Sequence, residues 1–451
     1  MNYFPRFLES PLKATIEEKT QHKNVLVLSG ARQVGKSTLI SHLLQEKPFL
    51  LLHLEKNPSI AAQIDRCENF EDFENYLQGE HQFNPTQKIL VIDEAQVSQK
   101  LGSFVRFMKE EWKEATVILT GSLINELYRE TPRRPVGRET YFTLWPLTFK
   151  EFLKAMDQDS LVETMEKFHA GNTLSTISHE RFAKYFDLYL NVGGLPEVVR
   201  AYKDQKDYRK VRADIYKTYE DDFVRYFSID DVNLFRRCLE AVASNVGSPS
   251  KDSHVVRVDS PGYKKVASIY ARLEKWHLLI KCEQLGLQPE ENKFSPKRYL
   301  YDVGILGDLR LKGIPTGSIR ELSSSMTRTP MGGLIENAVA LSLKTQFEDD
   351  IFGLKLSSRA EIDFGVKYKG LIYPVECKLS ERFKENFLVS LKTYHTKMAT
   401  NTPSFLLYGG LPLSKENIYV LPFYLADELK RLIQESQKNL GACRGNIFSN
   451  S

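Results

Sequence analysis

A short glycine-containing loop near the start of the chain has the residue types and spacing of a phosphate-binding site. The loop GARQVGKST follows the apolar run VLVLS and matches the pattern G-x-x-x-x-G-K-[ST]. In such loops the backbone N–H groups point at phosphate oxygens, and the following helix adds partial positive charge. We therefore predict an ATP site in which the Lys36 ammonium reaches the β- and γ-phosphates. The loop residues expected at the nucleotide are Gly30, Ala31, Arg32, Gln33, Val34, Gly35, Lys36, Ser37 and Thr38.

An acidic pair at the end of a second apolar run predicts how ATP is hydrolysed. The run KILVIDE places Asp93 at the carboxyl edge of a buried strand, beside the phosphate loop. Asp93 and the Ser37 hydroxyl are expected to hold Mg²⁺. Glu94 is expected to act as the general base that polarises the attacking water. The alternative, that both acids only cap a helix, fits less well with a phosphate loop upstream.

Two further positions are predicted to act on the γ-phosphate. The next apolar run ends in ILTGS, so Thr120 or Ser122 is expected to contact the γ-phosphate from the end of its strand. Arg138 is expected to add positive charge to the transition state, either in its own chain or from a neighbouring subunit. A homo-oligomer is therefore one open arrangement, and an ordinary surface arginine is the alternative for Arg138.

A second group of charged residues, near the C-terminus, predicts a metal site. Asp363 lies in one strand-like run, and Glu376 and Lys378 end the next one. Two adjacent antiparallel strands would bring Asp363 and Glu376 together around Mg²⁺, with Lys378 on the same face as Glu376. Glu336, on a helix predicted over Leu334–Thr345, would complete the metal shell. The chemistry implied is metal-assisted phosphodiester hydrolysis.

The E-x-K triplet by itself is a weak signal, because the same spacing recurs elsewhere in the chain. The alternative is a nuclease fold kept as a binding or structural module, with its carboxylates in salt bridges. The residues leave both interpretations open.

The apolar runs predict an α/β fold built from several domains. Short buried runs between helix-like segments are typical of parallel strands covered on both faces. The first domain is therefore expected to contain the strands Asn24–Ser29, Phe49–Leu54, Ile89–Asp93 and Thr116–Thr120. Later strands are expected at Trp276–Leu285, Ile362–Lys367, Leu371–Cys377 and Ser404–Tyr408.

Eight segments in this order resemble a known protein family. They are GARQVGKST, KILVIDEAQ, ILTGS, VGRETYFTLWPLTFKEF, Gly-Gly-Leu-Pro-Glu at 193–197, SPKRYLYDVGI, GGLIENAVALSL, and EIDFGV with IYPVECK. The family is that of bacterial and archaeal AAA-type P-loop ATPases with a C-terminal domain of unknown function, related to restriction-like PD-(D/E)xK nucleases. The resemblance implies an ATPase core, a winged-helix segment and a nuclease-like end domain, but no substrate.

The pattern and the resemblance together predict five regions. They are a P-loop AAA-type core at 1–155, a helical connector at 156–230, a winged-helix-like segment at 231–306, a linker at 307–330, and a restriction-nuclease-like α/β domain at 331–451. Within the third region, residues 263–275 form an amphipathic helix that leads into a strand, as a recognition helix leads into a wing. Its basic residues are expected to meet DNA phosphates: Lys264, Lys265, Arg272 and Lys275. The alternative is a helix that only packs by its apolar face.

Composition narrows the setting without deciding the substrate. No apolar run reaches the roughly 20 residues that a membrane span needs, and MNYFPRFLES lacks a signal-peptide core. The five cysteines form no CxxC pair, which fits a reducing cytoplasm. The net charge of +4 is low for a protein that coats nucleic acid. We expect a cytoplasmic ATPase that uses ATP and Mg²⁺, with DNA as its partner. A non-cleaving ATP-driven switch is the alternative, and an ATPase with a C-terminal interaction module is a third class.

Overall fold

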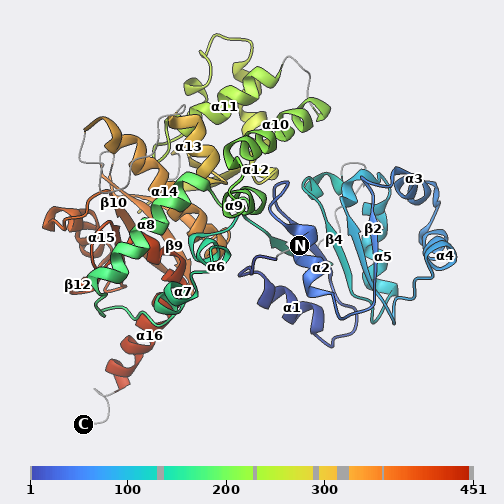
Figure 1. Cartoon of the computed structure of the whole chain (residues 1–451), viewed down its shortest axis with the longest axis horizontal. Helices are drawn as coiled ribbons and strands as arrows, with labels where there is room; N and C mark the ends of the chain where they lie inside the picture. The colour runs from blue at the N-terminus through green and yellow to red at the C-terminus, as the bar shows by residue number, and fades with distance from the viewer. Residues whose placement is uncertain are drawn as a thin grey trace. The chain divides into compact units, whose positions relative to one another are not determined.

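The protein is described by a computed structural model, which covers residues 3–128, 137–226, 231–287, 294–311, 325–357 and 360–445. Residues group into two units, one containing the chain up to Trp145 with Lys275–His277, the other Pro146–Glu274 and the chain from Leu278 onward. Figure 1 shows helices and strands in both units. None of the helices within these ranges is long and apolar enough to span a membrane.

The first unit is built on a five-stranded parallel sheet in the order β2-β3-β4-β1-β5. The central strands are fully buried apolar runs, which explains why each is read directly from the sequence. The predicted parallel α/β core is confirmed, and β5 is a strand that the sequence analysis did not predict. The strands are β1 (Val25–Ser29), β2 (Phe49–His53), β3 (Ile89–Asp93), β4 (Val117–Thr120) and β5 (Glu139–Thr143).

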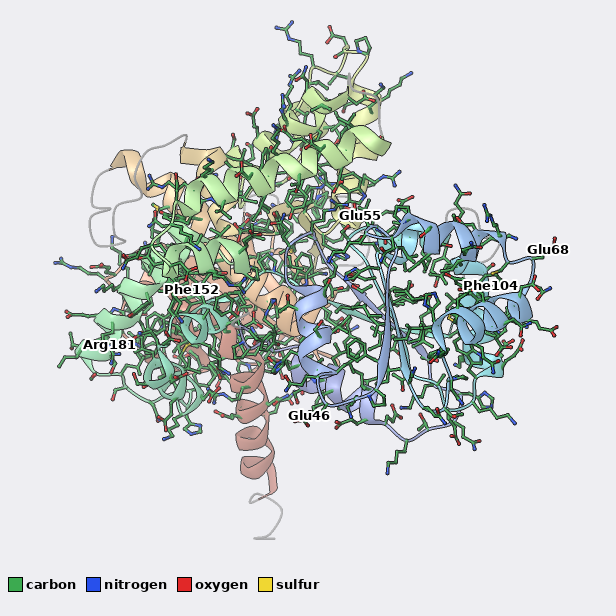
Figure 2. All side chains as sticks on the ribbon, turned by 45° about the vertical axis from the view of Figure 1, so that its right-hand side comes forward. Glu46, Glu55, Glu68, Phe104, Phe152 and Arg181 are labelled. Carbon is green, nitrogen blue, oxygen red and sulfur yellow. The ribbon has the colours of Figure 1, made fainter. Side chains whose placement is uncertain are left out.

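Helices cover the sheet of the first unit. Three of them, α3, α4 and α5, contribute buried side chains to one apolar core with alternate residues of β1 to β4. Phe104 of α5 points into this core, whereas Glu68 lies at the outer surface (Figure 2). The helices are α1 (Glu9–Glu17), α2 (Lys36–Leu43), α3 (Pro58–Arg66), α4 (Phe70–His81), α5 (Leu101–Glu111), and the 3-10 turns η1 (Ala95–Val97) and η2 (Ile124–Tyr128).

The second unit begins with a run of helices. The Gly-Gly-Leu-Pro segment lies between two of them, and the backbone N–H of Gly194 donates to buried Asp302 at 2.7 Å. Two of the family-like segments therefore contact each other, which gives both a structural role. The helices are α6 (Phe149–Ala155), α7 (Asp159–Glu166), α8 (Thr176–Val192), α9 (Pro196–Lys203), α10 (Tyr208–Tyr226), α11 (Val232–Ser244), the 3-10 turn η4 (Asp252–His254), α12 (Tyr263–Lys275) and α13 (Val303–Leu311).

An eight-stranded mixed sheet forms the rest of the second unit, in the order β12-β13-β11-β10-β9-β8-β6-β7. Helices α14 (Ser325–Phe347), α15 (Val389–Met398) and α16 (Leu429–Gly445) accompany it, with the 3-10 turns η7 (Glu385–Leu388) and η8 (Phe423–Glu428). The strands are β6 (Leu279–Gly286), β7 (Lys297–Leu300), β8 (Ile351–Lys355), β9 (Glu361–Tyr368), β10 (Leu371–Lys378), β11 (Ser404–Tyr408), β12 (Leu413–Lys415) and β13 (Ile418–Pro422).

Strands β6 and β7 connect two regions that the sequence analysis treats as separate. They form an antiparallel pair after α12, as a wing would, but β6 also pairs in parallel with β8. The segment predicted to be winged-helix-like therefore shares one sheet with strands of the predicted C-terminal domain, and its assignment as a winged helix stays a prediction. The predicted linker lies mostly at 312–324, outside the described residues, and helices α13 and α14 occupy its two ends.

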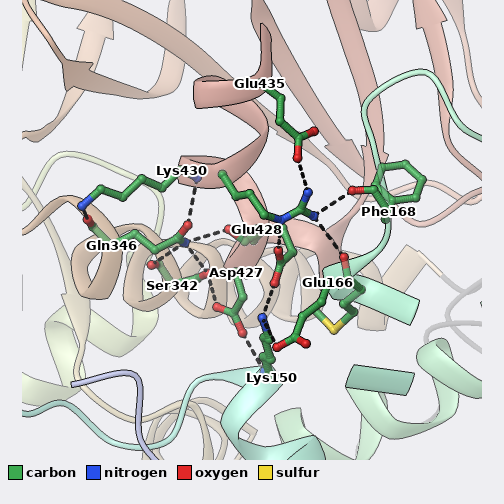
Figure 3. A network of polar contacts seen from close by, with 12 residues as sticks. Lys150, Glu166, Phe168, Ser342, Gln346, Asp427, Glu428, Lys430 and Glu435 are labelled. Atoms are coloured by element: carbon green, nitrogen blue, oxygen red, sulfur yellow. Dashed lines mark hydrogen bonds and ion pairs between the residues drawn. The ribbon is translucent and has the colours of Figure 1, made fainter. Parts of the chain in front are cut away.

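A buried polar network joins the start of the second unit to its end (Figure 3). Lys150 of α6 contacts Glu428 at 2.6 Å and Glu166 at 3.1 Å, and its backbone N–H donates to Asp427 at 2.7 Å. Arg431 of α16 in turn contacts Glu428 at 2.5 Å. These contacts connect α6, at the start of the second unit, to η8 and α16 near its end.

Candidate ATP site and carboxylate cluster

The phosphate loop follows β1 and adopts a conformation that only glycine allows at two positions. Gly30 has φ +145°, and a Cβ there would lie 2.3 Å from the carbonyl oxygen of Leu144. Gly35 has φ +98° and caps the N-terminus of α2. The two glycines at the predicted spacing thus turn the chain from the strand into the helix.

Lys36 is buried in the loop without a counter-ion. Its side-chain Nζ donates to the carbonyl oxygens of Gly30 at 2.9 Å and Ala31 at 2.8 Å. Within the described part of the chain it makes no ion pair, and it is 6% exposed. Burial lowers the pKa of Lys36 to about 8, although Glu94 and Asp93 favour the charged form. A buried cation that is held only by carbonyl dipoles suits an anionic ligand.

Asp93 and Ser37 meet at the end of β3. The Ser37 hydroxyl donates to Asp93 Oδ2 at 2.8 Å, and His53 Nδ1 lies 2.9 Å from the same oxygen. Burial raises the pKa of Asp93, and the Ser37 hydrogen bond opposes this shift. A hydroxyl and a carboxylate in contact beside a phosphate loop are oxygen donors that fit Mg²⁺. His53, at the end of neighbouring β2, is a site residue that the sequence analysis missed.

Glu94 is held in place from two sides. Its Oε2 accepts hydrogen bonds from Gln96 Nε2 at 2.6 Å, from Ser122 Oγ at 3.1 Å and from the Ser122 backbone N–H at 3.2 Å. No hydrogen bond among the described residues ends on Glu94 Oε1. One carboxylate oxygen is thus fixed by the protein, and the other is available to a water molecule. The sequence analysis missed Gln96, although it stands within the KILVIDEAQ segment.

The two strand-end residues predicted to sense phosphate have different surroundings. The Ser122 hydroxyl bonds Glu94, so in this structure it orients the candidate base. Thr120 is fully buried at the end of β4, and its hydroxyl has no hydrogen-bond partner within the described ranges. Contact of either residue with a γ-phosphate stays a prediction.

Arg138 cannot act on the nucleotide of its own chain. It precedes β5, and its carbonyl accepts from the Val25 backbone N–H at the amino end of parallel strand β1. The phosphate loop follows the carboxyl end of β1, about 16 Å away for a five-residue strand. Arg138 contacts Glu110 at 2.7 Å instead. The predicted role in its own chain is therefore wrong, and only a role toward a neighbouring subunit stays a prediction.

A cavity of about 620 Å³ opens beside the phosphate loop. Tyr3 lines it and stacks on His42 of α2, with ring centroids 3.9 Å apart. Within the loop, Arg32 contacts Glu55 at 2.8 Å and Gln33 has φ 61°. The cavity brings together the predicted residues Ser37, Thr38, Asp93 and Glu94 with Tyr3, Ser41, His42, Gln45, His53, Glu55 and Lys56.

The N-terminal segment supports the loop from behind. Buried Arg6 donates from Nη1 to the carbonyl oxygen of Val34 at 2.8 Å and from Nη2 to that of Trp145. The first contact fixes a backbone group inside the phosphate loop. Nothing in the residue pattern near Arg6 indicates this role, because the contact spans 28 positions.

The C-terminal carboxylates do come together. Strands β9 and β10 are antiparallel neighbours, as predicted. The Cys377 backbone N–H donates to Asp363 Oδ2 at 2.9 Å, and that of Asp363 donates to Glu376 Oε2 at 3.2 Å. Lys378 pairs with Glu376. Burial and the neighbouring Asp363 raise the pKa of Glu376.

A lysine that the sequence analysis missed occupies the same cluster. Lys297, at the start of β7, is fully buried, and its Nζ lies 3.4 Å from Asp363, 3.3 Å from Glu361 and 3.6 Å from Glu336. Burial alone would lower the pKa of Lys297, but the three carboxylates raise it. Glu336 also accepts from Tyr299 Oη at 2.8 Å.

As arranged, the cluster does not fit Mg²⁺. Asp363, Glu376 and Glu336 are the predicted ligands, yet Asp363 and Glu336 already surround an ammonium group and Glu376 pairs with Lys378. In the ranges that the structure describes, no three Asp, Glu, His or Cys side chains form a metal-binding group. The residues of the predicted site are therefore assembled as ion pairs.

The predicted helix 263–275 is confirmed as α12. Its apolar face is buried through Val266, Ile269, Tyr270 and Leu273, while Lys264, Lys265 and Lys275 are exposed. Lys265 pairs with Asp231 at 2.7 Å.

Of the arginines in the loop before β5, three lie outside the described residues: Arg129, Arg133 and Arg134.

Comparison with known families supports the first of these sites. A family model described as an AAA domain matches residues 22–153, which contain the phosphate loop, Asp93 and Glu94. These residues form a P-loop domain of the AAA type. A second model, described as a domain of unknown function (DUF8612), matches residues 183–316.

Two curated relatives are described as uncharacterised proteins. A protein of Haemophilus influenzae is 25% identical over 300 residues, which are 62% of this chain and 68% of the relative. Protein MJ1544 of Methanocaldococcus jannaschii is 23% identical over 253 residues, and the chain spans about half of its length. Among solved structures, the Walker-type ATPase PABY2304 of Pyrococcus abyssi aligns with 68% of this chain and 96% of its own, with 15% identity and a TM-score of 0.41.

Proposed function

We propose that the protein hydrolyses ATP in the first unit, with Glu94 as general base and Lys36, Ser37 and Asp93 as the phosphate and Mg²⁺ site. The observation that carries this proposal is the state of Lys36, a buried ammonium whose hydrogen bonds to described residues all go to carbonyl oxygens of its own loop. A phosphate would supply the missing negative charge. The match of residues 22–153 to an AAA domain supports the same assignment.

Each residue contributes one physical effect to the reaction. Lys36 and the loop N–H groups stabilise negative charge on the phosphates, and Ser37 and Asp93 supply oxygen donors for Mg²⁺. When bound there, Mg²⁺ would supply positive charge beside the phosphates. Glu94 accepts a proton from the water whose oxygen bonds to the γ-phosphorus, while the bond from that phosphorus to the β–γ bridging oxygen breaks, which gives ADP and inorganic phosphate. Gln96 and Ser122 hold Glu94 in the required orientation.

The test separates binding from hydrolysis. In Glu94→Gln the side chain keeps its size but no longer accepts the water proton, so we expect turnover to fall by about 10²- to 10⁴-fold. Binding of a fluorescent ATP analogue should stay within about twofold of wild type, since Glu94 is not assigned to the phosphates. Equal ATP turnover by the two proteins would show that Glu94 is not the base.

A role in DNA binding is our second candidate function, and α12 is the specific observation that favours it. Its exposed Lys264 and Lys275 lie on the face opposite the buried side chains, and exposed Lys265 lies beside that face. Replacing Lys264 and Lys265 with alanine should weaken binding of duplex DNA. The slope of the logarithm of the binding constant against the logarithm of the salt concentration should become shallower by about two. An unchanged slope would assign α12 a packing role only. Measuring ATP turnover with and without DNA would show whether the two functions are coupled.

A further inference from the structure

The carboxylate cluster of the second unit contains its own cation. Four acidic side chains lie in it, Glu336, Glu361, Asp363 and Glu376, and three lysines pair with them, Lys297, Lys355 and Lys378. Lys355 and Lys378 each pair with one carboxylate, on Glu361 and Glu376. Lys297 differs from both, because three acids from two elements surround it.

The distances show a central position for the Lys297 ammonium. Its Nζ lies between 3.3 and 3.6 Å from one oxygen of each of Glu336, Glu361 and Asp363. An ammonium paired with a single carboxylate usually approaches to about 2.8 Å. The three longer and nearly equal distances therefore place the charge between the acids, as a shared counter-ion.

Because the cluster is largely shielded from water, the charge of Lys297 and the charges of the carboxylates need each other. The Lys297 side chain is 0% exposed, and a lysine is almost never fully buried unless it is paired. Asp363 and Glu336 are only 16% and 14% exposed, so they also need a counter-charge. A divalent ion added beside Lys297 would put two cations in one buried cluster, which like-charge repulsion opposes.

We propose that Lys297 is the resident cation of this cluster, that it takes the place of the divalent metal of a restriction-like nuclease site, and that the second unit therefore does not cut nucleic acid with a metal. This inference does not depend on ATP hydrolysis in the first unit. It assigns the carboxylates a structural role. Any contact of the second unit with nucleic acid would then be binding without cleavage.

The experiment measures binding of Mn²⁺ alone to the nucleotide-free, full-length protein, by the signal of free Mn²⁺ in electron paramagnetic resonance. Each protein is compared with its own Asp363→Asn counterpart, so Mn²⁺ held at Asp93 cancels. Wild type and Asp363→Asn should bind equal amounts up to about 1 mM Mn²⁺. A deficit in Asp363→Asn would overturn the proposal, because wild type would then bind metal in the cluster.

A second pair tests the position of Lys297 itself. Lys297→Met removes the charge and keeps the volume, so it should bind one more Mn²⁺ than Lys297→Met with Asp363→Asn. Lys378→Met is the matched control and should gain none, since Lys297 still fills the cluster. A folded Lys297→Met protein without this gain, or an equal gain in Lys378→Met, would overturn the assignment. Should Lys297→Met fail to fold, the wild-type pair decides alone.

Discussion

Two buried lysines of this chain, Lys36 and Lys297, show how similar side chains are prepared for opposite tasks. In the described part of the chain Lys36 donates hydrogen bonds to two carbonyl oxygens and forms no ion pair, and burial lowers its pKa to about 8. Lys297 is surrounded by three carboxylates, which raise its pKa against the effect of burial. The first cation makes no ion pair with a described residue and is ready for a ligand, whereas the charge of the second is already balanced by carboxylates. The surroundings of a buried charge, and not its residue type, therefore indicate whether a site binds or only stabilises.

The largest effect on stability is expected from Lys297→Ala. Removing the buried cation leaves three partly buried carboxylates, Asp363, Glu336 and Glu361, without it, which should cost about 3–5 kcal/mol in the free energy of unfolding. Urea denaturation of the full-length protein measures this loss. Lys415→Ala, which removes an exposed lysine paired with Glu385, should change stability by less than about 0.5 kcal/mol. A loss below about 1 kcal/mol for Lys297→Ala would contradict the view that Lys297 balances the charge of these carboxylates.

Lys36→Ala should act on ATP turnover. It removes the ammonium expected at the phosphates, so we expect kcat/KM for ATP to fall by about 10²- to 10³-fold. Stability should change little or increase, because an uncompensated buried charge is removed. Lys47→Ala, just beyond α2, is the control and should keep wild-type turnover. If Lys36→Ala strongly destabilised the protein but kept its ATP turnover, Lys36 would stabilise the fold, as proposed for Lys297, and would not bind phosphate.

A third buried charged group, the Asp427 carboxyl beside Lys150, can be tested by the pH dependence of stability. Burial raises the pKa of Asp427 to about 6, and hydrogen bonds from Ser342, Lys150 and Thr148 oppose this. Because the folded protein binds this proton more tightly than the unfolded chain, the contribution is present below about pH 4 and is lost as pH rises to about 6. The loss is at most about 3 kcal/mol.

The pH series uses matched variants. Asp427→Asn cannot ionise at this position, so between about pH 4 and 6 its unfolding free energy should decline by up to about 3 kcal/mol less than that of wild type. The charged or titratable groups that face Asp427 are Lys150, Glu151, Tyr189 and Glu428. Asp204→Asn, at an exposed helix end, should retain the decline. Parallel pH profiles for wild type and Asp427→Asn would contradict the expected titration.

The smallest effect is expected from Gly121→Ala, which tests how Glu94 is oriented beside the phosphate loop. A Cβ on Gly121 would lie 2.1 Å from Gln96 Oε1, so Gly121→Ala should push Gln96 away from Glu94. Only the end of a flexible side chain must move, so the fold should persist while turnover falls about tenfold. Gly79→Ala in α4 is the control, since a Cβ there meets no atom within 4 Å. Unchanged turnover in Gly121→Ala would show that Gln96 does not orient Glu94.

Much of the first unit could be predicted from the sequence, because its signals are local. Buried parallel strands are uninterrupted apolar runs, and the phosphate loop is a contiguous motif with glycines at fixed positions. Both Asp93 and Glu94 follow such a run directly. The antiparallel placement of Asp363 beside Glu376 could also be predicted, since β9 and β10 are consecutive strands.

The remaining features depend on contacts between residues far apart in the chain. Arg138 pairs with Glu110 because a parallel strand puts its start at the sheet edge away from the loop. Lys297 reaches Asp363 across 66 positions, because β6 connects β7 to the sheet of β8 and β9. No periodicity or spacing encodes such a contact. The sequence by itself determined the phosphate loop and the two acidic strands, and only the tertiary structure decided that a lysine lies among the carboxylates of the second cluster.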